Sequence, residues 1–442
     1  MDLTHYMAPL RQTAFHARTA ALNLLNRWGP WAGYSASLCF GDSAMEYTAI
    51  RNTASLYDLC PMIKYRITGP DAGGYLNRLT LRDAARLSVG SVHCTAWCDD
   101  EGKILDDGTL FRQGQNDYLL SCQERHLPWL AASAQGFDVT VQDQTDAIAA
   151  LSLQGPSAAT ILQEAGFDVS ALKPFRFGRF AFKGAEITVS RTGFTGDLGY
   201  ELWLDPAQAI TLWDHLMAVG LPLGPRPIGS DALNLARIEA GFIIANMDFI
   251  PADQALREDS ARSPLELGLG WMIDWDKGHF TGRRALVAER EAGSAWALVG
   301  LDVPGNVSAE GSILYHGKKH EAGFVTAACW SPATKRSLAL AQVHWRHRKG
   351  DDLVAPLGLR RAPGRFCARQ DAPGDGRIGI SSGRTQCGWQ GQRLAQRLSS
   401  PWVGTLHRRK APGQACYLPL SRLVLFGHRR SSGVNRSCHS DL

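Results

Sequence analysis

The sequence predicts an α+β protein with more than one domain. Residues 147–220 alternate predicted strands and helices in an order typical of a ferredoxin-like α+β unit. Short strands separated by turn residues recur over 297–343, which is the pattern of a small β-barrel. The glycine motifs of flavin, nicotinamide and nucleoside triphosphate folds, GxGxxG and the P-loop, do not occur in residues 1–353. A flavin or nicotinamide fold is therefore not supported.

Length and composition are those of an ordinary soluble globular protein. The 442 residues suffice for roughly two to four domains. Hydrophobic residues make up 45% of the chain and charged residues 20%. No apolar run reaches the roughly 18 residues of a membrane helix, so no membrane partner is predicted. The first 29 residues lack the apolar core of a secretory signal and fit either an organelle presequence or an amphipathic helix. A cytoplasmic location is the default expectation.

The net charge of +5 conceals an uneven distribution of charge. Residues 1–345 carry 29 Lys and Arg against 37 Asp and Glu, whereas residues 346–442 carry 18 Lys and Arg against 5 Asp. An argument for nucleic-acid binding would therefore depend on the tail alone. The tail shows neither aromatic interleaving nor a basic helix, so no nucleic-acid partner is predicted.

The N-terminal part predicts alternating helices and strands. A helix is expected over 14–26, and a loop over 28–34 then carries two tryptophans and a tyrosine. Aromatic residues clustered in a loop either line a substrate pocket or plug a core. A second helix is expected over 44–54, a strand over 64–68 and a helix over 71–79.

A hairpin with two adjacent aspartates follows the predicted strand at 91–98. Its strands are expected over 103–112 and 118–122. Side chains alternate across a strand, so Asp106 and Asp107 face opposite ways. One of them then points inward, where a carboxylate is costly without a partner or a function. The alternative is a turn-proximal pair with both side chains partly wet.

The ten cysteines include no CxxC pair. Cys94 and Cys98 are four residues apart in a predicted strand and therefore share a face. A metal site would need further ligands at suitable spacing, and only His93 is adjacent. We interpret the two cysteines as buried thiols, and we predict no metal ligand.

The glycine-rich stretch 193–199 joins two predicted strands. Alternating residues precede it at 186–191, and Glu201 lies one residue into the strand that follows, on the same side as Trp203. A carboxylate beside an indole, next to a turn that exposes backbone, can hold a flat heterocycle. The alternative is an ordinary β-hairpin with one exposed glutamate.

The remaining elements follow in order. A helix from about 230 to Ala240 is closed by Gly241, and its Arg237 is left for polar contacts. Trp271 is expected in an apolar strand within 263–275. The other elements expected are a helix at 206–218 and strands at 148–153, 176–183, 297–302, 312–315, 323–330 and 338–343.

Eight motifs between Glu46 and Val343 resemble, in order, the aminomethyltransferase (glycine-cleavage T-protein) family of folate enzymes. They are the helix 44–54 followed by YDLCPM, then GKILDDGTL, LSLQGPSA, SRTGFTGDLGYELW, DALNLARIEAG, SPLELGLGW, FTGRRAL and GFVTAACWSPATKRSLALAQV. The resemblance implies a three-domain ring with tetrahydrofolate in its centre. Ferredoxin-like α+β pieces and a C-terminal small β-barrel would form the ring.

The resemblance also implies domain limits. Two folate-binding domains, an incomplete barrel and an irregular or disordered basic tail are expected at 1–60 with 147–225, at 61–146 with 226–285, at 286–353 and at 354–442, respectively. The tail after about Leu353 departs from the family pattern inside a domain. It represents either a disordered basic extension or a shifted reading frame. A frame shift would impair activity.

Residue roles carry over from the family motif by motif. Asp107 matches the catalytic carboxylate, and Glu201 matches the glutamate that binds the aminopyrimidine edge of the pterin. Met62 matches a folate-facing methionine, and Trp271 matches a tryptophan beside the pterin. The predicted cofactor-binding set is completed by Phe194 in the glycine-rich turn and by Arg237.

Several polar family positions are changed. The turn tyrosine is Phe194, an asparagine after the second hairpin strand is Cys122, and an arginine near the start of the 231–240 helix is Leu233. These changes favour a divergent branch over the carrier-protein-linked enzyme. The resemblance therefore implies transfer of a one-carbon unit to tetrahydrofolate from a small methylated or aminomethylated donor. A lipoyl carrier protein is the secondary candidate partner.

The alternative is a non-catalytic folate-binding protein that assists iron–sulfur assembly. Relatives of that kind carry a Lys-Gly-Cys-Tyr type motif. Here the sequence 277–280 reads Lys-Gly-His-Phe and has no thiol. Asp107 would also lack a purpose in such a protein.

Overall fold

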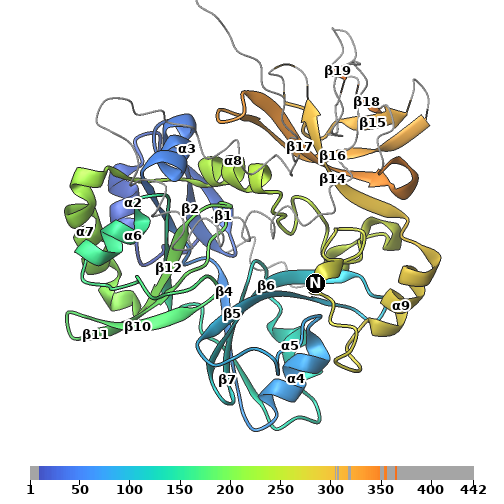
Figure 1. Ribbon diagram of the computed structural model, residues 1–442, viewed down its shortest axis with the longest axis horizontal. Coiled ribbons are helices and arrows are strands. Elements are labelled where there is room, and N and C mark those ends of the chain that lie inside the picture. Colours follow the sequence, from blue (N-terminus) through green and yellow to red (C-terminus); the bar gives the residue numbers. More distant parts are fainter. Residues whose placement is uncertain are drawn as a thin grey trace, which may run out of the picture.

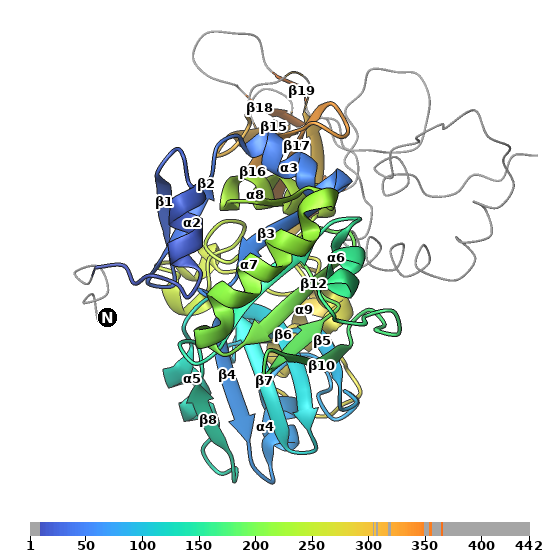
Figure 2. The same ribbon diagram turned by 90° about the vertical axis from the view of Figure 1, so that its left-hand side faces the viewer.

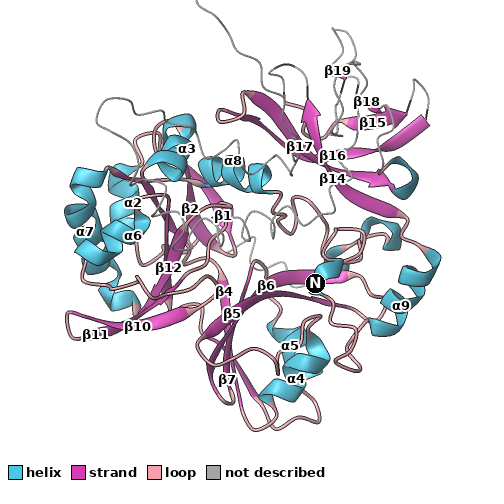
Figure 3. Cartoon of the chain, in the orientation of Figure 1, coloured by secondary structure: helices cyan, strands magenta, loops and turns pink. Residues whose placement is uncertain are grey.

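The computed structural model describes residues 9–303, 305, 308–316, 320–348, 353–355 and 364–365. Three lobes, each built on its own β-sheet, are arranged around a common centre (Figure 1). Helices cover the outer sides of the two N-terminal sheets (Figure 3). The predicted α+β class and the three-part ring are thus confirmed. Within the described residues, no helix is both long and apolar enough to cross a membrane.

The first lobe contains a six-stranded sheet in the order β10-β11-β12-β9-β3-β13. Its strands are β3 (Ala54–Asp58), β9 (Ala149–Gln154), β10 (Phe177–Phe182), β11 (Ala185–Ser190), β12 (Gly199–Leu204) and β13 (Pro225–Pro227). Helices α6 (Ala158–Glu164) and α7 (Ala209–Gly220) pack against one face, over alternate residues of the central strands such as Leu151 and Leu202. Because side chains alternate along β12, Glu201 and Trp203 lie on the opposite face.

The second lobe contains a five-stranded antiparallel sheet in the order β5-β6-β7-β4-β8. Its strands are β4 (Ile63–Thr68), β5 (Ser91–Cys98), β6 (Ile104–Gly114), β7 (Asp117–Cys122) and β8 (Thr140–Asp143). Helices α4 (Ala72–Leu79) and α5 (Leu127–Ser133) cover one face, where their apolar residues join the core around Tyr65. The hairpin predicted at 103–122 is present.

The C-terminal lobe contains a six-stranded sheet in the order β14-β17-β16-β15-β18-β19. Its strands are β14 (Trp296–Val303), β15 (Ile313–His316), β16 (His320–Ser331), β17 (Arg336–His344), β18 (Leu353–Ala355) and β19 (Gly364–Arg365). The first four match the predicted strands. Helix α9 (Arg283–Ala292) precedes the sheet. The predicted tail lies almost wholly outside the described residues, and the predicted domain limits stay predictions.

Two helices lie between the first sheet and the C-terminal sheet (Figure 2). They are α3 (Ser43–Asn52) and α8 (Ser230–Ala240), both predicted from the sequence. Asp42 caps α3 by accepting hydrogen bonds from the backbone N–H groups of Ala44 and Met45. Gly241, with a φ of 74°, ends α8 in the left-handed conformation that glycine tolerates best. These helices connect the first lobe to the C-terminal lobe.

Two predicted elements differ in the structure. The helix predicted over 14–26 is shorter (α2, His16–Leu22), and the aromatic loop is a hairpin of β1 (Arg27–Trp31) and β2 (Tyr34–Cys39). Its two-residue turn has positive φ at both positions, the geometry that matches strand twist.

The apolar strand predicted around Trp271 is wrong. That segment is irregular and contains a single 3₁₀ turn (Gly270–Met272). The Ser263 hydroxyl accepts a hydrogen bond from the Glu266 backbone N–H, and the Glu266 carboxylate accepts one from the Ser263 backbone N–H. This reciprocal pair turns the chain at the start of the segment, so it cannot run as a strand.

Candidate active site

A cavity of about 620 Å³ lies where the three lobes meet. Its volume is within the range of small-molecule binding sites. Residues from all three lobes line it, among them Trp31, Tyr57, Met62, Cys94, Asp107, Cys122, Phe194, Glu201, Leu233, Phe242, Trp271 and Leu298. Asp107 and Glu201, predicted from motifs that are 94 residues apart, therefore share one cavity.

Glu201 is a buried acid without a positive partner. The residue is 9% exposed, and Oε2 accepts a hydrogen bond of 2.6 Å from the Thr192 hydroxyl. No ion pair to Glu201 occurs among the described residues. Burial raises the pKa of Glu201 to about 7, and the hydrogen bond from Thr192 opposes this shift. The carboxylate is thus held in a fixed orientation, and no described residue donates a hydrogen bond to its other oxygen.

The glycine-rich turn before Glu201 is held by Gln154 at the end of β9. The Gln154 amide nitrogen donates to the carbonyls of Thr192 (3.3 Å) and Tyr200 (3.1 Å). Its amide oxygen accepts from the Thr195 hydroxyl (3.2 Å). A Cβ at Gly193 would lie 2.0 Å from this oxygen, and a Cβ at Gly199 1.9 Å from it. Both glycines therefore leave room for the amide.

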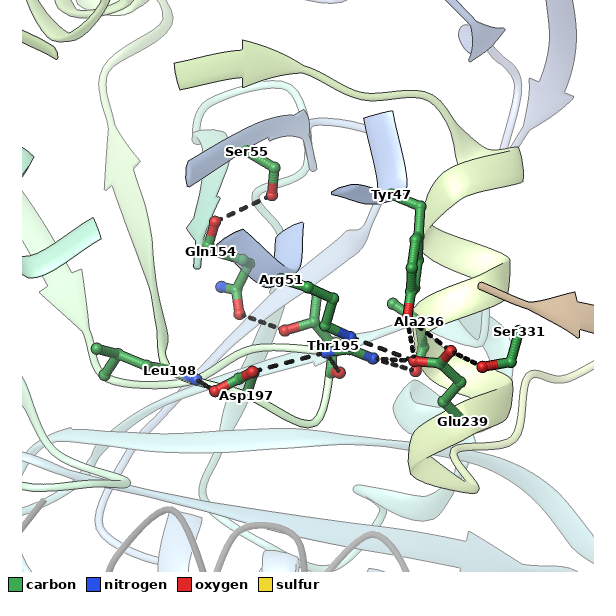
Figure 4. A network of polar contacts seen from close by, with 10 residues as sticks. All are labelled: Tyr47, Arg51, Ser55, Gln154, Thr195, Asp197, Leu198, Ala236, Glu239 and Ser331. Carbon is green, nitrogen blue, oxygen red and sulfur yellow. Dashed lines mark hydrogen bonds and ion pairs between the residues drawn. The ribbon is translucent and has the colours of Figure 1, made fainter. Parts of the chain in front are cut away.

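A second set of polar contacts anchors the same turn from outside (Figure 4). Arg51 on α3 donates to the Thr195 carbonyl (2.8 Å) and pairs with Glu239 on α8 (2.7 Å). Glu239 also accepts hydrogen bonds from the hydroxyls of Tyr47 and of Ser331 in the C-terminal lobe. A continuous network therefore runs from the C-terminal lobe to the turn that positions Glu201. Sequence reasoning did not find Gln154 or this network.

The adjacent aspartates of β6 face opposite ways, as predicted. Asp106 is fully buried and accepts hydrogen bonds from the backbone N–H groups of Asp107 and Glu124 (2.9 Å each) and from His126 Nε2 (3.2 Å). Asp107 is half-buried and lines the cavity, and no other described residue donates a hydrogen bond to its carboxylate. Burial, followed by the nearby Asp106 carboxylate, raises the pKa of Asp107 above the ordinary aspartate value.

Two thiols of the second lobe line the cavity beside Asp107. Cys94 lies opposite Thr109 in the β5–β6 ladder, and Asp107 pairs with Ala96 two residues further along the ladder. Burial raises the pKa of Cys94 to about 12, and the charges of Asp107 and Glu201 contribute to this shift. Burial raises the pKa of Cys122 as well. Both groups stay protonated thiols at neutral pH, so neither acts as a thiolate nucleophile.

Three of the four other predicted cofactor-binding residues line the cavity. Met62, Phe194 and Trp271 are all in its wall. The Phe194 ring stacks on Phe242, which follows α8, with the ring centroids 5.2 Å apart and the planes 23° from parallel. This arrangement forms an aromatic wall on the side of the glycine-rich turn.

Arg237 lies behind the cavity wall and not in it. Its guanidinium is fully buried, forms an ion pair with Asp248 and donates to Asn234 (2.7 Å) and to the Phe242 carbonyl (3.0 Å). Asp248 in turn accepts from the backbone N–H of Ile244 (2.9 Å). These contacts fix the segment 241–248, part of which lines the cavity. The cofactor-binding role of Arg237 stays a prediction, and this geometry does not favour it.

The cavity suits a flat ligand that carries a polar edge. A bidentate carboxylate interaction needs two adjacent N–H donors, and the aminopyrimidine edge of a pterin presents such donors. Glu201 supplies the carboxylate, with one oxygen that lacks a partner among the described residues. Aromatic rings such as Phe194 and Trp271 provide faces for packing. The residues present therefore fit tetrahydrofolate.

Family models match most of the chain. The model described as the GCVT N-terminal domain matches residues 12–277, and the glycine cleavage T-protein C-terminal barrel domain matches residues 297–370. The chain belongs to the glycine cleavage T-protein family. The barrel match of this family extends past residue 353, where the motif resemblance ends.

The chain is similar to enzymes of two different names. An aminomethyltransferase of Halothermothrix orenii is 32% identical over 71% of this chain and 86% of its own length. A trimethylamine-oxide aldolase of Ruegeria pomeroyi is 32% identical over 77% of this chain but only 44% of its own length. The solved aminomethyltransferase T of the Bartonella henselae glycine cleavage system has the same fold, with a TM-score of 0.72, 22% identity and coverage of 81% of this chain and 96% of that chain.

Proposed function

We propose that this protein is a tetrahydrofolate-dependent transferase that moves a one-carbon unit from a methylated or aminomethylated donor to the folate. One observation carries the proposal. Asp107 and Glu201 are carboxylates without a positive partner among the described residues, and they face the same cavity from different lobes. Membership of a family that contains aminomethyltransferases supports it.

Glu201 is proposed to hold the pterin. Thr192 and the turn around it keep the carboxylate oriented before any ligand arrives. Preorganisation of this kind lowers the entropic cost of binding. Two N–H donors on the ligand would favour the ionised acid and so lower its raised pKa.

Asp107 is proposed to act at the reacting carbon. Tetrahydrofolate would supply the nitrogen nucleophile that accepts the one-carbon unit. Positive charge develops on the donor side during such a transfer, and a fixed carboxylate stabilises it in a cavity that excludes much of the water. The raised pKa of Asp107 also allows it to take a proton near neutral pH. The apolar wall around it strengthens both effects.

The iron–sulfur assembly alternative receives less support from the structure. The first and last residues of the segment 277–280, which echoes the motif of those proteins, make structural contacts. Lys277 Nζ donates to the backbone carbonyls of Asn77 (2.8 Å) and Thr80, and Phe280 is fully buried. Lys277 and Phe280 thus hold this segment against the second lobe. Asp107 has a proposed role only in the transferase.

Titration with tetrahydrofolate, combined with turnover assays, tests the proposal. Glu201→Gln is expected to weaken folate binding at least about tenfold, because the amide is a poorer bidentate acceptor. Asp107→Asn is expected to bind folate normally and to lose about 10²–10³ in kcat. Normal folate affinity in Glu201→Gln would show that the pterin lies elsewhere. Unchanged turnover in Asp107→Asn would refute the catalytic role.

The donor for these assays is found by screening. Methylated amines, sulfonium compounds, methoxyaromatics and an aminomethyl-lipoyl carrier cover the donor types that the proposed chemistry admits. The product is followed as methyl- or methylene-folate. If only the aminomethyl-lipoyl carrier gives product and no free small molecule does, this chain belongs with the carrier-linked enzymes and not in a divergent branch.

A further inference from the structure

Among the Asp, Glu, Lys, Arg and His side chains of the described residues, only acids line the cavity. Four carboxylates are found among the described lining residues, Asp107, Glu124, Glu201 and Asp231, and none of those residues is a Lys, Arg or His. A donor whose carboxylate or phosphate lies beside Asp107 would therefore meet acids and no Lys, Arg or His of the described lining. Like charges brought together in a desolvated site repel each other.

Two of the four acids are already satisfied. Asp231 forms an ion pair with Arg27 (2.9 Å), and Glu124 accepts a hydrogen bond from the Asn246 side chain (3.0 Å). From the part of the chain that the structure describes, the Glu201 carboxylate accepts a hydrogen bond from the Thr192 hydroxyl alone. The Asp107 carboxylate has no donor from another described residue. If the pterin uses Glu201, Asp107 is the acid left for the second substrate.

Thiol and aromatic side chains line the same cavity as Asp107. The neighbouring Cys94 is a protonated thiol, and Trp271 packs in the same apolar cluster as Cys94. Trp31 and Tyr57, stacked with centroids 6.0 Å apart, line the same cavity. An unpaired carboxylate together with aromatic rings attracts ammonium groups, which gain from both the charge and the ring faces.

We propose that the cavity selects a compact ammonium donor that carries no carboxylate or phosphate, with its positive centre at Asp107. This inference deepens the proposed function, on which it rests for the role of the ligand as donor. The binding site itself requires only Asp107 and the apolar wall. Zwitterionic N-methyl amino acids are rejected because their carboxylate finds no basic residue in the described lining.

Three probes of nearly the same shape test the proposal without turnover. Choline is a cation, 3,3-dimethyl-1-butanol is its neutral isostere, and glycine betaine adds a carboxylate to the same trimethylammonium group. Each is titrated calorimetrically into the full-length protein without folate. Choline is expected to bind at least about tenfold more tightly than either of the other two. Equal or tighter binding of betaine, or no binding of choline at millimolar concentration, overturns the proposal.

Variants locate the site within the cavity. Asp107→Asn is expected to abolish the preference for choline over its neutral isostere. Glu201→Gln is expected to keep that preference, and so is Asp231→Asn, which removes an acid already paired with Arg27. Loss of the preference in Glu201→Gln but not in Asp107→Asn would place the cation at Glu201 and refute its assignment to Asp107.

The test also separates this inference from the proposed function. Folate binding is measured on the same protein samples, and the amine titrations need no folate. Normal folate binding with a preference for betaine would reject the ammonium donor and leave the transferase intact. Absence of folate binding would reject the transferase, independently of how choline, its isostere and betaine bind.

Discussion

At the scale of single residues, the buried Glu201 carboxylate costs the ligand-free protein stability. Its pKa is raised from 4.5 to about 7 by burial. Between these two pH values the folded chain holds a proton that the unfolded chain has released. The free energy of unfolding therefore falls as pH rises through this window, by about 3 kcal/mol in total.

Replacing Glu201 by glutamine removes this cost. Glu201→Gln is expected to melt at a higher temperature than the wild type at pH 8, and the difference is expected to shrink toward pH 5. Thermal unfolding followed by circular dichroism measures it. Glu186→Gln, at an exposed glutamate on the neighbouring β11, serves as the control and should melt like the wild type at both pH values. Identical melting of Glu201→Gln and wild type at pH 8 would contradict the assigned pKa.

The same pKa predicts how folate binding depends on pH. Bidentate recognition requires the ionised acid, and the ionised fraction of Glu201 rises about tenfold between pH 6 and pH 8. Tetrahydrofolate affinity, measured by calorimetry, is therefore expected to rise by up to about tenfold over this range. Glu201→Gln should lose this dependence. An affinity that falls as pH rises would be inconsistent with Glu201 as the pterin acceptor.

The direction in which a side chain points was predictable where strand alternation decides it. Asp106 and Asp107 had to face opposite ways, and Glu201 had to share a face with Trp203. Which aspartate faces the cavity came from the family resemblance. The partners of Asp106, namely His126 and the Glu124 backbone, come from a neighbouring turn whose position depends on tertiary packing. No local pattern reveals such contacts.

At the scale of elements, the glycine-rich turn and the end of β9 form one unit. Gly193→Ala is expected to weaken folate binding and to lower the melting temperature, because its Cβ would lie 2.0 Å from the Gln154 amide oxygen. Gln154→Ala makes room, so the double variant should be more stable than the sum of the single changes predicts. Gly300→Ala, where nothing lies within 4 Å of the added Cβ, is the control for the glycine substitution.

A double-mutant cycle of Gly193→Ala and Gln154→Ala measures the interaction free energy between the two residues. Full additivity of the two changes would show that Gly193 and Gln154 do not interact through this contact.

The sequence indicated the turn and both strands around it, because glycines and alternating residues are local signals. It did not indicate Gln154, because the amide acts on a turn more than 35 residues further along the chain.

Two elements were wrongly predicted for the same reason. The hairpin at 27–39 contains Gly29 and Pro30, which locally favour a loop, yet it pairs as a small sheet at the edge of the first lobe. The segment around Trp271 is apolar like a strand, but side-chain hydrogen bonds near Ser263 redirect it. In both cases hydrogen bonds formed within the segment override the preference that its composition indicates.

At the scale of the whole molecule, Asp248 joins the lobes. Its carboxylate pairs with the fully buried Arg237 behind the cavity wall and accepts a hydrogen bond from Thr326 of the C-terminal sheet (2.8 Å). Its backbone carbonyl accepts from the Gln342 side chain of the same sheet. A single residue therefore connects α8, the cavity wall and the C-terminal lobe.

Removing this carboxylate leaves a buried guanidinium without its counter-charge. Asp248→Ala is expected to lower the free energy of unfolding by about 3–5 kcal/mol, measured by urea denaturation. Asp302→Ala, which breaks the largely exposed pair with Arg336, is the matched control and should cost at most about 1 kcal/mol. Equal losses in the two variants would mean that the buried pair does not hold the lobes together.

In the ring, Asp107 and Glu201 lie on strands, and the rest of the cavity wall comes from separate parts of the chain. β6 and β12 fix the acids through their ladders, whereas loops and helix ends supply most of the surrounding surface. Substitutions in the walls can accumulate during descent without moving either acid. One scaffold can in this way acquire new reactants while its chemistry stays constant.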